Sequence, residues 1–118
     1  MEQRHVGDSG LRVSLVGLGC NNFGLRIDAE ASARVIHKAL DAGITLFDTA
    51  DVYGNKGGSE NCLGHCLGAR RKDVVIASKF GSPMDASGAR QGASREHRTR
   101  SAPRGNRAQS SLLCRVRR

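Results

Sequence analysis

Three side chains that could move a proton follow two apolar runs near the middle of this sequence. Asp48 ends the run that begins at Leu46, and Tyr53 follows it five residues later. Lys79 closes the next apolar run, which begins at Val74. A carboxylate, a phenol and an ammonium, each placed just after a strand-like segment, are the components of a proton-donating site.

The segments around these residues predict strands that alternate with helices. An Asp-Ser-Gly turn at residues 8–10 predicts a hairpin over residues 6–13. Apolar runs predict buried strands at residues 13–18, 45–49 and 74–78. Because strands joined through helices by short links are parallel with right-handed crossovers, we expect residues 1–80 to form a hairpin followed by βαβαβ.

Two helices are expected between these strands. Asp28 can cap the first helix at its N-terminus, and Gly43 suits the position just after its C-terminus. The apolar face of this helix is predicted to hold Ala31, Val35, Ile36, Ala39 and Leu40. The second helix is expected after Ser59 and ends at Gly68. Its apolar face is predicted to hold Leu63, Cys66 and Leu67.

The composition of the chain changes abruptly after Gly81. Residues 1–80 carry ten Lys and Arg against nine Asp and Glu, whereas residues 81–118 carry nine Arg against two acids. All aromatic residues lie in the first 80 positions. The later segment shows no sustained periodicity and too few apolar residues to offset its ordering entropy. We therefore expect a disordered, Arg-rich C-terminal segment.

Composition also limits the location and redox state of the chain. No apolar run approaches the length needed to span a bilayer, and the first residues lack the apolar core of a secretory signal. The default expectation is a cytoplasmic protein. Its four cysteines have no disulfide-framework spacing, so we expect them to be thiols.

The motifs Phe47-Asp-Thr-Ala-Asp-Val-Tyr-Gly54 and Ile76-Ala-Ser-Lys-Phe80 strongly resemble those of the aldo-keto reductases. The opening segment 7–19 and the segment 58–64 resemble the same family. The resemblance runs to about residue 94 and implies the N-terminal part of a TIM (β/α)8 barrel in an enzyme that reduces small carbonyl compounds with NADPH.

By this resemblance, Asp48, Tyr53 and Lys79 correspond to three of the four catalytic residues of the family. Tyr53 would protonate the carbonyl oxygen as hydride arrives, and Lys79 would lower the pKa of its phenol by favouring the phenolate. Asp48 would hold Lys79 by a charge-assisted hydrogen bond. The fourth residue is a histidine after the next strand, and His97 is not assigned to that role because no strand precedes it.

The resemblance also implies contacts to the NADPH cofactor. They fall on residues at or just after the first two strands, namely Cys20, Asn21, Arg26 and Asp48. At Cys20 and Asn21 the family usually has other residue types.

A complete barrel needs about 200–250 residues or more, and this sequence supplies three strands. We therefore interpret residues 1–94 as a partial aldo-keto reductase domain that is inactive by itself. Residues 95–118 are interpreted as a disordered basic tail produced by a frameshift or a truncation, because the apolar pattern and lysine give way to arginine.

Other functions remain open at this stage. The alternative to the enzyme is a non-catalytic remnant or a basic binding module, since the Arg-rich segment could bind phosphates. Nucleic-acid binding is not favoured, because no aromatic residue lies between the arginines to stack on bases. Cys62, His65 and Cys66 lack a second ligand pair for a tetrahedral metal site, so we expect no metal.

Overall fold

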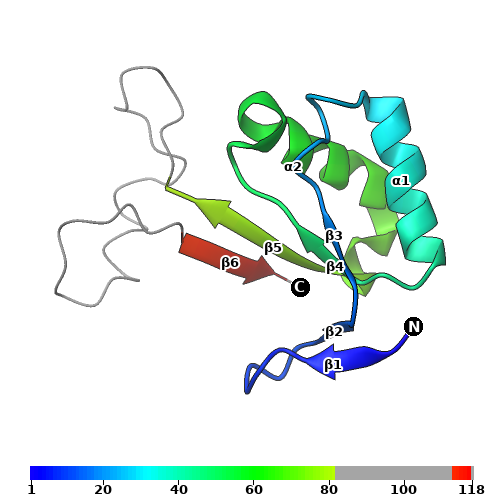
Figure 1. Ribbon diagram of the computed structural model, residues 1–118, viewed down its shortest axis with the longest axis vertical. Helices are drawn as coiled ribbons and strands as arrows, with labels where there is room; N and C mark the ends of the chain where they lie inside the picture. The colour runs from blue at the N-terminus through cyan, green and yellow to red at the C-terminus, as the bar shows by residue number, and fades with distance from the viewer. Residues whose placement is uncertain (82–112, 118) are drawn as a thin grey trace, which may run out of the picture.

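The computed structural model describes residues 1–81 and 113–117. It begins with a hairpin, in which β1 (Gln3–His5) pairs antiparallel with β2 (Arg12–Ser14). The turn at residues 8–10 is as predicted, but the bounds 6–13 are wrong, because β1 ends before Val6. In the turn, the Ser9 hydroxyl donates to the Val6 carbonyl oxygen over 2.6 Å. The hairpin lies at the end of the sheet where the next strand begins (Figure 1).

The main sheet has the predicted parallel order. Strand β3 (Gly17–Gly19) pairs with β4 (Leu46–Asp48), and β4 pairs with β5 (Val75–Phe80). The expectation of a buried strand over residues 13–18 is wrong in its bounds, because Leu15 and Val16 are 51% and 52% exposed. These two residues link the hairpin to the sheet, outside the layer that the helices cover.

Helix α1 (Ala29–Asp41) forms as predicted and is capped at both ends. The Asp28 carboxylate accepts a hydrogen bond from the backbone N–H of Ala31 over 2.8 Å. The helix stops before Gly43, whose φ of 82° is favourable only for a residue without a Cβ atom.

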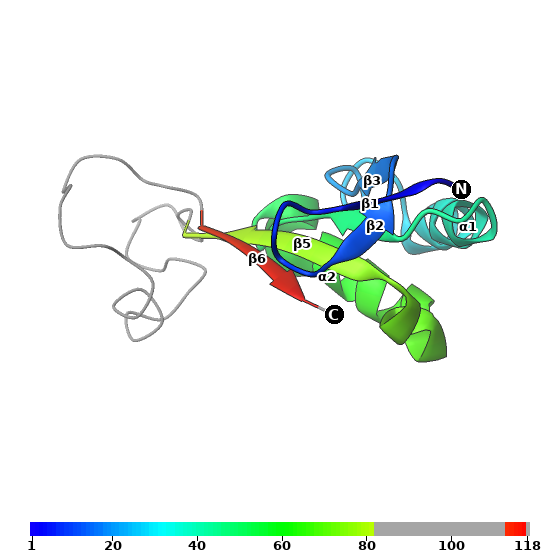
Figure 2. The same cartoon turned by 90° about the horizontal axis from the view of Figure 1, so that it is seen from below.

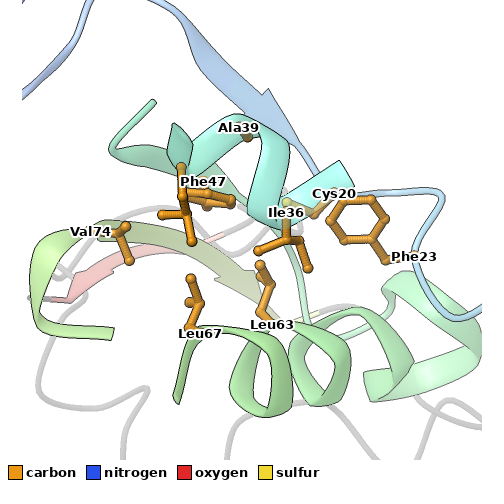
Figure 3. Packing of buried hydrophobic residues seen from close by; sticks show 9 residues of the cluster. Cys20, Phe23, Ile36, Ala39, Phe47, Leu63, Leu67 and Val74 are labelled. Atoms are coloured by element: carbon orange, nitrogen blue, oxygen red, sulfur yellow. The ribbon is translucent and has the colours of Figure 1, made fainter. Parts of the chain in front are cut away.

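The core lies between the two main helices and one face of the sheet (Figure 3). Its fully buried members include Ile36 of α1 and Phe47 of β4, both at 0% exposure. The predicted apolar face of α1 is wrong at Val35, which is 40% exposed, whereas the polar Ser32 is buried. Ser32 is tolerated there because its hydroxyl donates to the Asp28 carbonyl oxygen.

Helix α2 (Tyr53–Leu67) begins with an irregular turn. Residues 54–57 all have positive φ, and the regular helix follows them, close to the predicted start at Ser59. Leu63 and Leu67 are buried, as predicted, whereas Cys66 is only half-buried. Helix α2 ends at Gly68, where the short helix η1 (Gly68–Asp73) begins. No helix in the described part of the chain is long and apolar enough to cross a membrane.

A further strand, β6 (Leu113–Arg117), lies alongside β5 in both perpendicular views (Figures 1 and 2). It pairs antiparallel, with Phe80 opposite Leu113 and Ile76 opposite Arg117. The expectation of disorder is therefore wrong for these five residues, because the edge of β5 offers hydrogen-bonding partners that compositional arguments do not consider. Residues 82–112, which include the predicted domain boundary at 94 and 95 and most of the Arg-rich segment, lie outside the described residues.

Candidate active site

The register of the sheet places Asp48 and Lys79 on the same face. Asp48 is opposite Ala77 of the neighbouring strand, and Lys79 is two residues further along β5. Since side chains alternate between the faces of a strand, Ala77 and Lys79 point the same way as Asp48. Both polar side chains lie toward the ends of their strands, as the sequence predicts.

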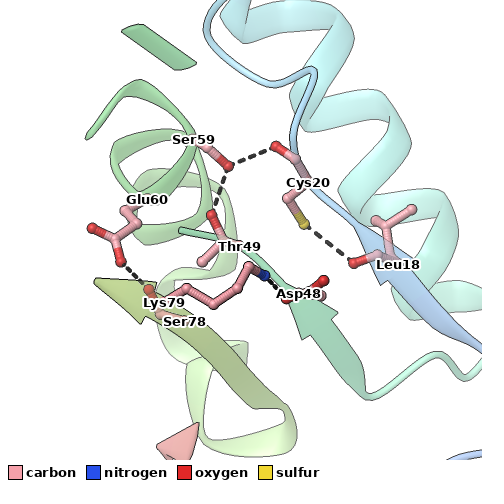
Figure 4. Close-up of polar contacts among 8 residues, drawn as sticks. All are labelled: Leu18, Cys20, Asp48, Thr49, Ser59, Glu60, Ser78 and Lys79. Atoms are coloured by element: carbon pink, nitrogen blue, oxygen red, sulfur yellow. Dashed lines mark hydrogen bonds and ion pairs between the residues drawn. The ribbon is translucent and has the colours of Figure 1, made fainter. Parts of the chain in front are cut away.

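Lys79 makes two interactions with predicted site residues. Its Nζ forms an ion pair with Oδ1 of Asp48 (Figure 4). The same Nζ lies 5.2 Å from the centroid of the Tyr53 ring. The Lys79 side chain is 19% exposed and that of Asp48 is 54% exposed, so the ammonium is the better shielded partner. The structure thus brings together all three residues that the sequence predicts to be catalytic.

The loop that carries Tyr53 is fixed by backbone hydrogen bonds to β5. The N–H of Thr49 donates to the Ala77 carbonyl over 2.8 Å, and the N–H of Asp51 donates to the Lys79 carbonyl over 3.0 Å. These bonds continue the pairing of β4 with β5 beyond the end of β4. The phenol-bearing loop and the Lys79 backbone are therefore held at a fixed separation.

Two buried hydroxyl groups lie beneath this loop. Thr49 Oγ1 and Ser59 Oγ are 2.9 Å apart, and Ser59 Oγ donates to the Cys20 carbonyl over 2.7 Å (Figure 4). Both side chains have 0% exposure. Sequence reasoning missed this contact because no local pattern indicates that a residue ten positions later folds back onto Thr49.

Asp51 is a second residue that sequence reasoning missed. Both of its carboxylate oxygens are buried, and the backbone N–H groups of Val52 and Gly81 lie near them. Burial raises the pKa of this carboxyl, an effect that the nearby N–H of Val52 moderates and the charge of Glu60 reinforces. The Glu60 carboxylate accepts a hydrogen bond from Ser78 over 2.6 Å. The signal of Asp51 in the sequence is a second carboxylate, between Asp48 and Tyr53 in the same motif.

The four predicted cofactor residues fall into two groups. Asn21 and Arg26 are exposed in the loop after β3, and Asp48 is half-exposed at the end of β4. Because β3 and β4 are parallel, both positions lie at the same edge of the sheet. Cys20 is fully buried, and its thiol lies 3.4 Å from the Leu18 carbonyl. Its side chain therefore belongs to the core and offers no contact surface to a cofactor.

The Cys20 thiol is also a poor nucleophile, because it stays protonated. Burial, together with the nearby charge of Asp48, raises its pKa from 9.0 to about 12. The loop that follows is packed closely, because Gly24, with a φ of 71°, lies against Gly58.

In the region 1–81, no cluster of three or more His, Cys, Asp or Glu side chains could hold a metal ion. His65 instead contacts the Asn61 carbonyl of its own helix through Nδ1, over 2.8 Å.

Comparison with known proteins identifies the family. The model of the Aldo/keto reductase family matches residues 15–108, which is well over half of the chain. The chain therefore belongs to the aldo/keto reductase family.

The chain is similar to several named proteins. It is 42% identical over 90 residues to the uncharacterized oxidoreductase YrpG of Bacillus subtilis. This match covers 71% of this chain and 28% of that protein. It is 38% identical over 84 residues to a probable voltage-gated potassium channel subunit beta of Oryza sativa. This match covers 68% of this chain and 25% of that protein.

Solved structures agree with this assignment. The holo form of an aldo-keto reductase from Bacillus halodurans matches with a TM-score of 0.67 and 35% identity, covering 77% of this chain and 30% of that one. A putative aldo-keto reductase from Pseudomonas aeruginosa matches with a TM-score of 0.58 and 41% identity, covering 67% of this chain and 31% of that one. This chain thus spans under a third of the length of these relatives.

Proposed function

We propose that Asp48, Tyr53 and Lys79 form the proton-donating part of a site for NADP(H)-dependent reduction of an aldehyde or ketone. The observation that supports this proposal most strongly is the position of Lys79, which is ion-paired with Asp48 and lies against the Tyr53 ring. A phenol must lose its proton to act as an acid, and an ammonium beside it stabilises the phenolate that remains.

Each residue has a distinct part in this proposal. The Tyr53 hydroxyl gives its proton to the carbonyl oxygen of the substrate. Lys79 stabilises the resulting negative charge, and Asp48 fixes the ammonium in place by a charge-assisted hydrogen bond. Such a contact of an ammonium with an aromatic ring contributes about 0.5–2 kcal/mol, depending on its desolvation.

The residues at this edge of the sheet suit a phosphorylated dinucleotide. Arg26 supplies a guanidinium and Asn21 an amide, and both are exposed after β3. These groups match phosphate and ribose oxygens. NADPH, when bound, supplies the hydride for the reduction. Asn21, Arg26 and Asp48 are the residues that we propose to contact it.

The chain on its own is proposed to bind cofactor weakly and to be inactive. Three parallel strands, β3 to β5, form one side of the site among the described residues. A barrel surrounds its substrate with loops from eight strands, and these loops exclude water and set specificity. The substrate is accordingly proposed only as a small carbonyl compound.

The proposal is tested by titrating the 118-residue chain with NADPH and following cofactor fluorescence. We expect weak but saturable binding, with a Kd in the millimolar range that corresponds to about −4 kcal/mol. Arg26→Ala should weaken the binding. The matched control is Arg34→Ala, which removes an exposed arginine on α1 that pairs with Glu30 and should leave binding unchanged.

Two results would contradict this account. Absence of saturable binding at millimolar NADPH would favour a non-catalytic remnant or a basic binding module. Equal loss of binding in Arg26→Ala and Arg34→Ala would indicate non-specific attraction of the cofactor to positive charge.

A further inference from the structure

The segment between Thr49 and Ser59 is a closed loop that carries Tyr53. Its two ends meet where Thr49 Oγ1 and Ser59 Oγ lie 2.9 Å apart, with both side chains fully buried. The loop is joined to a third element, because Ser59 Oγ donates to the Cys20 carbonyl over 2.7 Å. Cys20 in turn donates its N–H to the Asp48 carbonyl over 2.8 Å.

The direction of these hydrogen bonds follows from the number of protons available. A serine hydroxyl has one proton, and that of Ser59 is used on the Cys20 carbonyl, which can only accept. Thr49 must therefore donate to Ser59. The two hydroxyls form a directed relay from Thr49 through Ser59 to Cys20, and both residues are fully buried from solvent.

The backbone between the ends of this loop is strained. Asn55 and Lys56 have φ values of 59° and 69°, in the left-handed region that L residues with a side chain rarely adopt. The loop also folds back tightly, because a Cβ atom on Gly54 would clash with the backbone of Ser59 and of Phe23. A strained turn persists only where its surroundings determine its conformation.

We propose that Thr49 and Ser59 are positioning residues for Tyr53, and that their hydroxyl relay holds the left-handed turn so that the phenol ring stays against Lys79. The significance of this position rests on the proposed role of Tyr53 as proton donor. Both hydroxyls bond within the buried relay, to each other and to the Cys20 carbonyl. They act by fixing the turn at residues 54–57, which directly follows Tyr53, to the loop after β3.

The chain offers a direct probe, because it contains one tyrosine and no tryptophan. The experiment measures the rate constant for acrylamide quenching of Tyr53 fluorescence, from fluorescence lifetimes, in the full chain without cofactor. Thr49→Val keeps the side-chain shape but removes the donor, and Ser59→Ala removes the link to Cys20. In both variants we expect quenching to rise roughly two- to threefold, as a half-buried ring becomes accessible. Thr49→Ser keeps the hydroxyl and should quench like the unaltered chain.

Ser14→Ala is the matched control for general loss of stability. Ser14 is 2% exposed, donates to the Val16 carbonyl over 2.6 Å and accepts from the Thr45 N–H over 2.9 Å. The Ser14→Ala variant therefore loses comparable hydrogen bonds at a position just before β4, at the end of the sheet opposite the candidate active site. Circular dichroism of each variant verifies that the helices remain, and if Ser59→Ala fails to fold, the isosteric Thr49→Val decides the outcome.

Quenching in Thr49→Val that equals that of the unaltered chain would overturn the proposal. So would an equal rise in Ser14→Ala, because the effect would then reflect stability alone. Since the measurement needs no cofactor, a failure of NADPH to bind would count against the proposed function and leave the positioning role measurable.

Discussion

Lys79 shows how a single residue depends on the geometry around it. It lies 31 residues from Asp48 in sequence, yet their strands are adjacent and their side chains share a face. The Lys79 ammonium also lies 5.2 Å from the centroid of the Tyr53 ring. Strand order and the period of two are enough to predict that Asp48 and Lys79 meet. The placement of Tyr53 is different, because it depends on a turn whose backbone no pattern of residue types predicts.

Cys20 provides a prediction at the residue scale. Because burial raises the pKa of its thiol to about 12, almost no thiolate forms at pH 8, and the thiolate is the reactive species. We expect native Cys20 to react with iodoacetamide at least about tenfold more slowly than in urea, as measured by peptide mass spectrometry. Equal rates in the native and unfolded chain would show that the thiol is accessible.

The same thiol makes stability depend on alkaline pH. A pKa raised from 9.0 to about 12 in the folded state favours the neutral thiol. This contribution is fully present below pH 9 and is lost as pH rises from about 9 toward 12. Cys20→Ala cannot ionise, so we expect unfolding by urea to depend less on pH across this range than in the unaltered chain. An unchanged pH dependence would exclude Cys20 as its source.

At the scale of elements, the regular helices are the most predictable parts. A carboxylate at Asp28 and a glycine at Gly43 mark the ends of α1, because capping is a local interaction between a side chain and nearby backbone. The exposure of Val35 was not predictable, since it depends on where α2 and the sheet meet α1. Gly54, Asn55 and Gly57 tolerate positive φ, but Lys56 does not favour it. The run of four such residues in the irregular turn of α2 was therefore also unpredictable.

The cap of α1 is testable by amide hydrogen exchange. Asp28→Ala removes the acceptor of the Ala31 N–H and should cost about 1 kcal/mol, which corresponds to roughly fivefold faster exchange in the first turn of α1. Asp41→Ala is the control, because it alters an exposed carboxylate at the other end of the helix, 3.5 Å from Arg70. First-turn exchange that is unchanged in Asp28→Ala would contradict the capping role.

At the scale of the whole molecule, the described residues are similar to one part of the solved aldo-keto reductases. The parallel order β3-β4-β5 follows from alternating strands and helices. The two solved structures match this chain over about 30% of their own length, with TM-scores of 0.58 and 0.67. Strand β6 could not be predicted, because its pairing with β5 joins segments more than 30 residues apart in a composition that favours disorder. The family assignment rests on the match over residues 15–108, and within residues 17–80 the strands and helices agree with the pattern in the sequence.

The central claim is that this chain itself brings the phenol and the ammonium of the site together. Nuclear Overhauser effects between the Tyr53 ring protons and the Lys79 ε-methylene protons test it most directly, because they report protons that are close in space and Tyr53 is the sole tyrosine. We predict clear effects in the 118-residue chain and weaker ones in Asp48→Asn, which loses the ion pair that holds the ammonium. Absence of these effects in a chain whose α1 and α2 are folded would contradict the account.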